Sequence, residues 1–61
     1  MNVTEITNKL ENAGFEVNFD YPFVVVSLTN RSVTTGEIKA VFNHAITNNI
    51  IRMGNNVLIQ A

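Results

Sequence analysis

The sequence has no cysteine, no tryptophan and one proline, and its 61 residues include a single histidine. Without cysteine there are no disulfides or thiolate metal ligands, a composition typical of proteins from a reducing compartment. A structural zinc site needs four Cys or His ligands, which this chain lacks. A chain of this length buries only about 60% of the surface that it exposes when unfolded. We therefore expect the free energy of unfolding to be small. A well-packed core or self-association would have to supply it.

The chain also lacks any run of charge of one sign. Its formal net charge is −1, from four basic and five acidic residues. Its four basic residues are scattered, whereas a surface that follows phosphates needs clustered Lys and Arg. A nucleic-acid partner is therefore not the leading hypothesis.

Long hydrophobic runs are absent as well. No apolar stretch approaches the roughly 20 residues of a membrane-spanning helix. The first residues also lack the basic, apolar and small-residue order of a signal peptide. We expect no membrane association and a cytoplasmic location.

The first segment has the pattern of an amphipathic helix. Apolar residues recur at spacings of three and four from Val3 to Ala13, which places them on one side of a helix. Asn2 and Glu5 form a candidate capping box, and Gly14 is a candidate left-handed cap. The sequence therefore predicts a helix over residues 3–13.

The segment from Phe15 to Leu28 has the pattern of a β-hairpin. Apolar and polar residues alternate from Phe15 to Asp20, as in a strand with one buried face. The stretch 20–23 contains the only proline and predicts a turn. The run Phe23–Leu28 is apolar at almost every position and predicts the second strand.

Two registers of this hairpin remain open. A four-residue loop pairs Phe19 with Val24 and points Val25 away from the core. A three-residue loop shifts the parity and buries Val25 and Ser27 instead. We prefer the first register because it buries Leu28 rather than Ser27. That register leaves Val25 without a covering layer from this chain.

A second helix is predicted after the hairpin. Thr34 and Glu37 form another candidate capping box, and the apolar residues that follow recur at helical spacing. The pattern predicts a helix over residues 35–48, with His44 on its polar side.

The end of this helix is open to two interpretations. In one, the helix continues to Met53 and Gly54 caps it. In the other, it stops near Asn48, and residues 50–53 form a strand that turns into a final strand over residues 57–60. In both versions Leu58 points outward beside Val25.

These elements predict one α+β domain over residues 1–61. Their order is αββαβ, or αββαββ with the additional hairpin. In either case two amphipathic helices cover one face of a small, mostly antiparallel sheet.

No pattern of catalytic, cofactor-binding or metal-binding residues is present. His44 is the only side chain with an ordinary pKa near neutrality, but it has no carboxylate or cysteine at ligand spacing. The five acids show no close pairing, and a chain this small encloses little space for a substrate. We expect that the protein is not an enzyme and uses no cofactor.

The leading hypothesis is a small protein-interaction module that binds a protein partner or forms a homodimer. It rests on the surplus apolar surface of the sheet and on the absence of site chemistry. Small size and frequent asparagine also suggest an accessory protein of a phage or mobile element that modulates a host protein. The candidate partner-binding residues are Tyr21, Phe23, Val25 and Leu58.

Two alternatives belong to other functional classes. The first is a weak nucleic-acid-binding module, with Arg31, Lys39 and Arg52 on phosphates and Tyr21 or Phe23 stacked on bases. The second, ranked last, is a small enzyme centred on His44.

Overall fold

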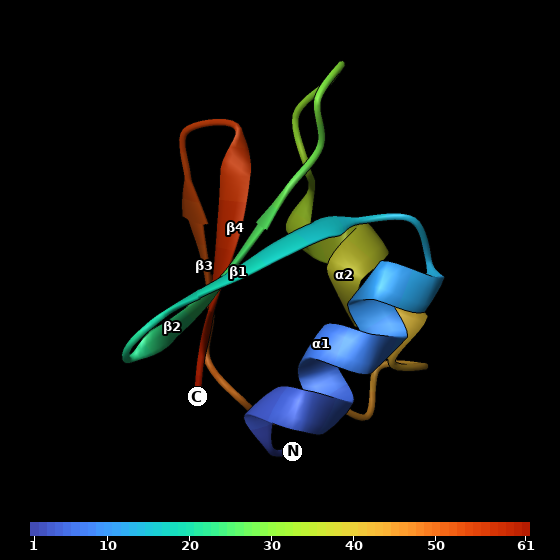
Figure 1. The fold of residues 1–61 in the computed structure, drawn as a ribbon. Helices are drawn as coiled ribbons and strands as arrows, with labels where there is room; N and C mark the ends of the chain where they lie inside the picture. The colour runs from blue at the N-terminus through green and yellow to red at the C-terminus, as the bar shows by residue number, and fades with distance from the viewer.

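The computed structural model describes residues 1–61 and shows a two-layer α+β fold in the order αββαββ. Four antiparallel strands form one sheet in the order β1-β2-β4-β3, and both helices lie on the same face of it (Figure 1). The elements are α1 (Val3–Asn12), β1 (Glu16–Asp20), β2 (Phe23–Ser27), α2 (Thr35–Val41), β3 (Ile50–Met53) and β4 (Asn56–Gln60). The predicted fold class is confirmed, in its version with the additional hairpin.

Helix α1 is capped at both ends by its own sequence. The Glu5 backbone N–H donates to Asn2 Oδ1 at 2.9 Å, so Asn2 satisfies one of the free donors of the first turn. After the helix, Gly14 adopts a φ of 94°, where a side chain would be strained. The Phe15 N–H then donates back to the Leu10 carbonyl at 3.0 Å, which closes the helix and redirects the chain into β1.

Strands β1 and β2 pair in the preferred register, which places Phe19 opposite Val24. The predicted four-residue loop is wrong, because Asp20 also pairs with Phe23. The connection is therefore the two-residue turn 21–22, which contains a cis peptide bond before the proline. Since the parity is unchanged, the two faces of β2 are those that the sequence predicted.

Helix α2 begins as predicted, with a complete capping box. The Glu37 N–H donates to Thr34 Oγ1 at 3.2 Å, and the Thr34 N–H donates to the Glu37 carboxylate at 2.8 Å. The helix ends at Val41, however, so the predicted end at residue 48 is wrong. The alternative that extends it to Met53 is also wrong.

The early end of α2 follows from its backbone. Asn43 and His44 have φ angles of 53° and 59°, in the left-handed region that ends a right-handed helix. The His44 N–H donates to the Lys39 carbonyl at 2.8 Å. Ile46 lies beyond the helix, yet it still packs against the core. Apolar spacing therefore identified a residue that contacts the core, but not the conformation that brings it there.

Residues after Asn49 form the second hairpin, as one of the two interpretations predicted. Strands β3 and β4 pair from Ile50 opposite Ile59 to Met53 opposite Asn56, and Gly54 in the turn has a φ of 59°. This hairpin extends the sheet beside β2. It does not fold over the outer face.

The core lies between the sheet and the two helices. It contains nine buried residues, all apolar, and it is contributed by every element except β1 and β3. Val33, in the connection before α2, was not predicted as a core residue. The buried residues are Ile6, Leu10, Val24, Val26, Val33, Ile38, Phe42, Val57 and Ile59.

Candidate interaction surface

The face of the sheet opposite the helices carries a diagonal band of apolar side chains. Val24 and Ile59 are buried on the helical side, so their neighbours Val25 and Leu58 point to the other side. Val25 lies opposite Leu58, and Leu58 lies opposite Ile51. We define the outer stripe as Phe23, Val25, Ile51, Met53 and Leu58.

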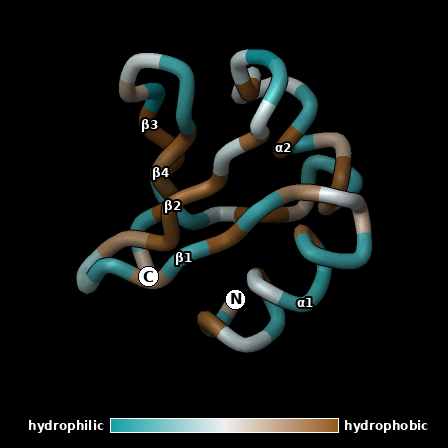
Figure 2. The backbone as a smooth tube through the Cα atoms, turned by 45° about the horizontal axis from the view of Figure 1, so that its top comes forward, coloured by the Kyte–Doolittle hydropathy of each residue, from teal (hydrophilic) through white to brown (hydrophobic).

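The outer stripe becomes more exposed toward β3. Phe23, Val25 and Leu58 are half-buried because neighbouring strands shield them, whereas Ile51 is 44% exposed and Met53 is 63% exposed. Figure 2 shows hydrophobic backbone segments gathered where β2, β4 and β3 lie side by side. The most accessible apolar side chains of the stripe are therefore those at the edge of the sheet.

The structure brings three of the four predicted partner-binding residues together. Phe23, Val25 and Leu58 share the outer face, whereas Tyr21 lies in the hairpin turn and is 82% exposed. The Tyr21 ring makes an edge-on contact with Phe19, with ring centroids 6.3 Å apart. Tyr21 is therefore not part of the stripe.

Phe19 itself departs from expectation. Its pairing with Val24 places it on the helical side, but it is 53% exposed because it lies near the turn of an edge strand. Its contact with Tyr21 gives it a neighbour outside the core.

Ile51 and Met53 are the members of the stripe that sequence reasoning missed. The signal was present in the hairpin interpretation of residues 50–60. Once Leu58 points outward, a two-residue turn at 54–55 places Ile51 opposite it and Met53 on the same face. The residues stayed unassigned because the competing helical interpretation gave them other neighbours.

Polar residues border the stripe on the side of β1. Glu16, Asn18 and Asp20 occupy the outer face of that strand, and Asn18 lies opposite Val25. The Thr29 hydroxyl donates to the Glu16 carboxylate. The outer face thus has an apolar half on β4 and β3 and an acidic half on β1, with β2 between them.

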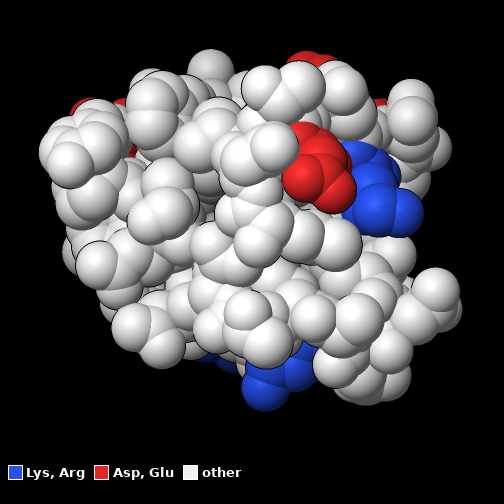
Figure 3. Space-filling view, turned by 90° about the horizontal axis from the view of Figure 1, so that it is seen from below, with Lys and Arg blue, Asp and Glu red and all other residues white.

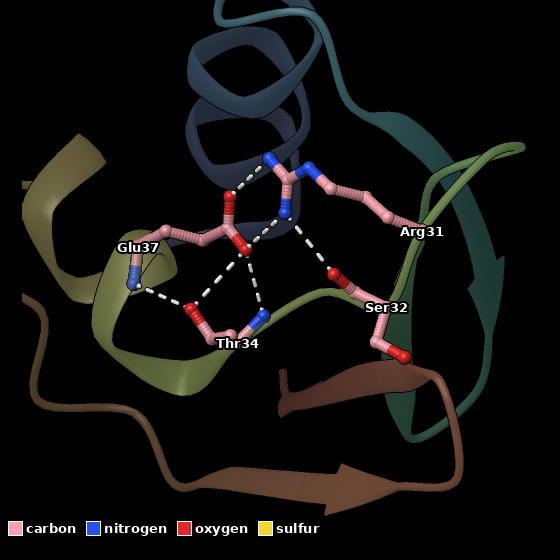
Figure 4. A network of polar contacts seen from close by, with 4 residues as sticks. All are labelled: Arg31, Ser32, Thr34 and Glu37. Carbon is pink, nitrogen blue, oxygen red and sulfur yellow. Dashed lines mark hydrogen bonds and ion pairs between the residues drawn. The ribbon is translucent and has the colours of Figure 1, made fainter.

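A second polar cluster lies at the start of α2 (Figure 4). Two Arg31 nitrogens donate to the two Glu37 carboxylate oxygens, each at 2.8 Å, and one of them also donates to the Ser32 carbonyl at 3.1 Å. The Arg31 guanidinium and the Thr34 N–H together lower the pKa of Glu37 to about 2, and Glu37 raises the pKa of Arg31. These contacts occupy the carboxylate fully, so the cluster serves as a helix cap.

His44 has no partner for catalysis. It is exposed in the turn after α2, and not on the polar side of a helix as predicted. Glu37, an acid at the start of α2, is bound to Arg31 and Thr34. The structure contains no group of three possible metal ligands and no pocket.

The basic residues considered for nucleic-acid binding lie on three different segments of the chain. Arg31 is paired with Glu37 at 2.8 Å, Lys39 lies on α2, and Arg52 lies on β3. Figure 3 shows basic atoms in separate places on a face that is mostly uncharged. On the face in view, the basic atoms therefore form no continuous surface.

Comparison with family models, with curated proteins and with solved structures gives no match. Neither helix has the length and apolar content needed to cross a membrane. Function is therefore inferred from the chain's own surfaces.

Proposed function

We propose that this chain is a non-enzymatic protein-interaction module that binds a protein partner through the outer stripe. The observation that carries the proposal is the row of aliphatic side chains formed by Val25, Leu58 and Ile51. This row lies on a sheet face that no element of the chain covers. Contiguous apolar surface of this kind marks interaction sites in small proteins. The cytoplasmic location expected from the sequence belongs to the same proposal.

The composition of the outer face supports this function. Protein interfaces combine an apolar centre, low in charge, with a polar rim. Here Val25 and Leu58 form the centre, while Glu16, Asp20 and Gln60 stand around it. Because the centre is built on paired strands, it is held in place before a partner arrives, which lowers the ordering cost of binding.

Single-cysteine labelling tests the proposal directly, because the chain has no cysteine of its own. A benzophenone attached to Leu58→Cys is irradiated in the purified chain and in an extract of the source cells. The same label on Asn8→Cys, an exposed position of α1, is the matched control. We expect protein adducts from position 58 and not from position 8.

A captured protein is then purified, and its affinity is measured for the unlabelled chain. Val25→Lys should weaken that binding by at least about tenfold, since it places a charge at the desolvated centre. Asn8→Lys should leave it unchanged. If the two labelled positions give the same adducts, or if Val25→Lys binds as well as the parent chain, the outer stripe is not the interface.

A further inference from the structure

Strand β3 ends the sheet and leaves one side of its backbone without a partner strand. The Gln60 N–H donates to the Asn49 carbonyl at 2.9 Å, so Asn49 faces β4. Antiparallel strands alternate between residues that bond to the neighbour and residues that do not. Ile51 and Met53 therefore also face β4 with their backbone groups, whereas the N–H and C=O groups of Ile50 and Arg52 point away from the sheet.

We propose that β3 pairs antiparallel with β3 of a second copy of this chain, about a twofold axis at Ile51. The proposal goes beyond the proposed function: it concerns the free edge beside the outer stripe, and it leaves Val25 and Leu58 open to a protein partner. In this arrangement each Ile51 lies opposite Ile51 of the second copy. Each Ile50 lies opposite Arg52 of the second copy, and the two exchange backbone hydrogen bonds.

The backbone and the side chains together select this register. Residues that exchange hydrogen bonds across the axis must both direct their backbone N–H and C=O groups away from β4. Ile50 and Arg52 are the two residues of β3 that do so. Moving the axis by one residue to Arg52 keeps the hydrogen bonding possible but sets Arg52 against Arg52, two like charges directly opposite. Centring on Ile51 instead brings two aliphatic side chains together in a pair without hydrogen bonds, where side chains approach most closely.

The side chains of both faces fit the same register. On the helical side the aliphatic part of Arg52 lies over the half-buried Ile50 of the second copy, while its guanidinium stays in water. On the outer side the Ile51 pair joins the two outer stripes into one. Ile51, which is 44% exposed in the single chain, gains the cover that this chain does not supply.

The opposite edge of the sheet disfavours the same association. Pairing of β1 with β1 of a second copy about Asn18 would set Glu16 opposite Asp20 twice. Like charges directly opposite each other are destabilising. Charged residues are also a common protection of edge strands against pairing. Strand β3 has no acidic residue, so its self-pairing about Ile51 carries no such repulsion.

Two strands of four residues make a small interface, below the roughly 1,200 Å² of a standard one, so we expect a dissociation constant on the order of micromolar. Sedimentation equilibrium of the full chain up to about 1 mM should show a particle of twice the 6.8 kDa chain mass. Ile51→Lys and Ile51→Glu should each raise the dissociation constant at least about tenfold, because each sets like charges across the axis.

An equal mixture of Ile51→Lys and Ile51→Glu should restore the dimer, since the axis then carries one charge of each sign. Asn18→Lys, at the centre of the β1 edge, is the matched control and should dimerise like the parent chain. Circular dichroism establishes that each variant is folded. If either variant proves unfolded alone, hydrogen exchange of the parent chain replaces it, and the Ile50 and Arg52 amides should gain protection as concentration rises.

Three results would overturn the pairing. They are a parent chain that stays monomeric at about 1 mM, a dimer that Ile51→Lys and Ile51→Glu leave intact, and a mixture that fails to recover. Lack of concentration-dependent protection at Ile50 and Arg52 would do the same. A monomeric parent chain whose Leu58 label captures a different protein would overturn this inference and leave the proposed function standing.

Discussion

The two faces of the sheet carry the same kinds of side chain in opposite surroundings. On the helical face Val24 and Ile59 are fully buried, whereas on the outer face their neighbours Val25 and Leu58 have no second layer above them. The difference shows that apolar content alone does not reveal which face of a strand is the core. The lengths of the turns decide which residues of a strand face the core, since a shift of the pairing by one residue exchanges the two faces.

The same comparison explains why one face stays open. A short chain has few elements with which to build layers, and here both helices are used on the inner face (Figure 1). The additional hairpin widens the sheet instead of covering it. Any second layer over the outer stripe would have to come from another molecule, which is the basis of the proposed function.

The largest expected effect comes from truncating one residue on each face at adjacent positions of β4. Ile59→Ala removes a fully buried side chain and should lower the free energy of unfolding by about 2–5 kcal/mol. Leu58→Ala removes a half-buried one and should cost less than about 1 kcal/mol in the dilute monomer. Urea unfolding at low concentration measures both.

Because the stability of so small a chain is limited, Ile59→Ala can unfold in water. Ile59→Val is then the measured variant, with an expected loss of about 0.5–1.5 kcal/mol. Equal losses of unfolding free energy at positions 58 and 59 would contradict this expectation, since they would mean that both faces are packed to the same degree.

Much of this fold could be predicted from the sequence because several local signals agree. The capping residues Asn2 and Thr34 mark the two helix starts, and Gly14 marks the first helix end. The hairpin register followed from the difference between Leu28 and Ser27. These signals depend on residues close together in the chain, so no long-range information was needed.

The end of α2 could not be predicted, because no local signal in the sequence marks it. Apolar spacing continues to Ile46, and only the left-handed conformation of Asn43 and His44 shows that the helix has already ended. Asn tolerates that conformation, but many Asn residues do not adopt it. With the helix end unknown, Ile51 and Met53 could not be assigned to the outer stripe.

The second prediction concerns helix α2, which covers part of the inner face of the sheet. Thr34→Ala removes the hydroxyl that accepts the Glu37 N–H and should lower the free energy of unfolding by about 1 kcal/mol. Thr4→Ala, at an exposed position of α1 whose side chain takes no part in the helix cap, is the control and should change stability by less than about 0.5 kcal/mol. A loss at Thr34 no larger than that at Thr4 would show that α2 does not depend on its cap.

The smallest expected effect is the pH dependence that Glu37 brings to the same helix. Its pKa is about 2 in the folded chain against an ordinary value of 4.5, chiefly because Arg31 donates to it. The folded state therefore binds this proton less readily than the unfolded state does. The stability from Glu37 is complete above pH 4.5 and is lost as the pH falls toward 2.

Glu37→Gln should accordingly be less stable than the parent chain at pH 7, and the gap should narrow as the pH falls from 4.5 toward 2. The gap at pH 7 should be smaller than the effect of Thr34→Ala, because water and salt screen exposed ion pairs. Glu11→Gln, an exposed acid of α1, is the matched control. Arg31→Gln should move the narrowing to higher pH, since it removes the main cause of the lowered pKa. A gap that stays constant from pH 7 to the acid limit would show that Glu37 supports α2 only through its shape, and not through its charge.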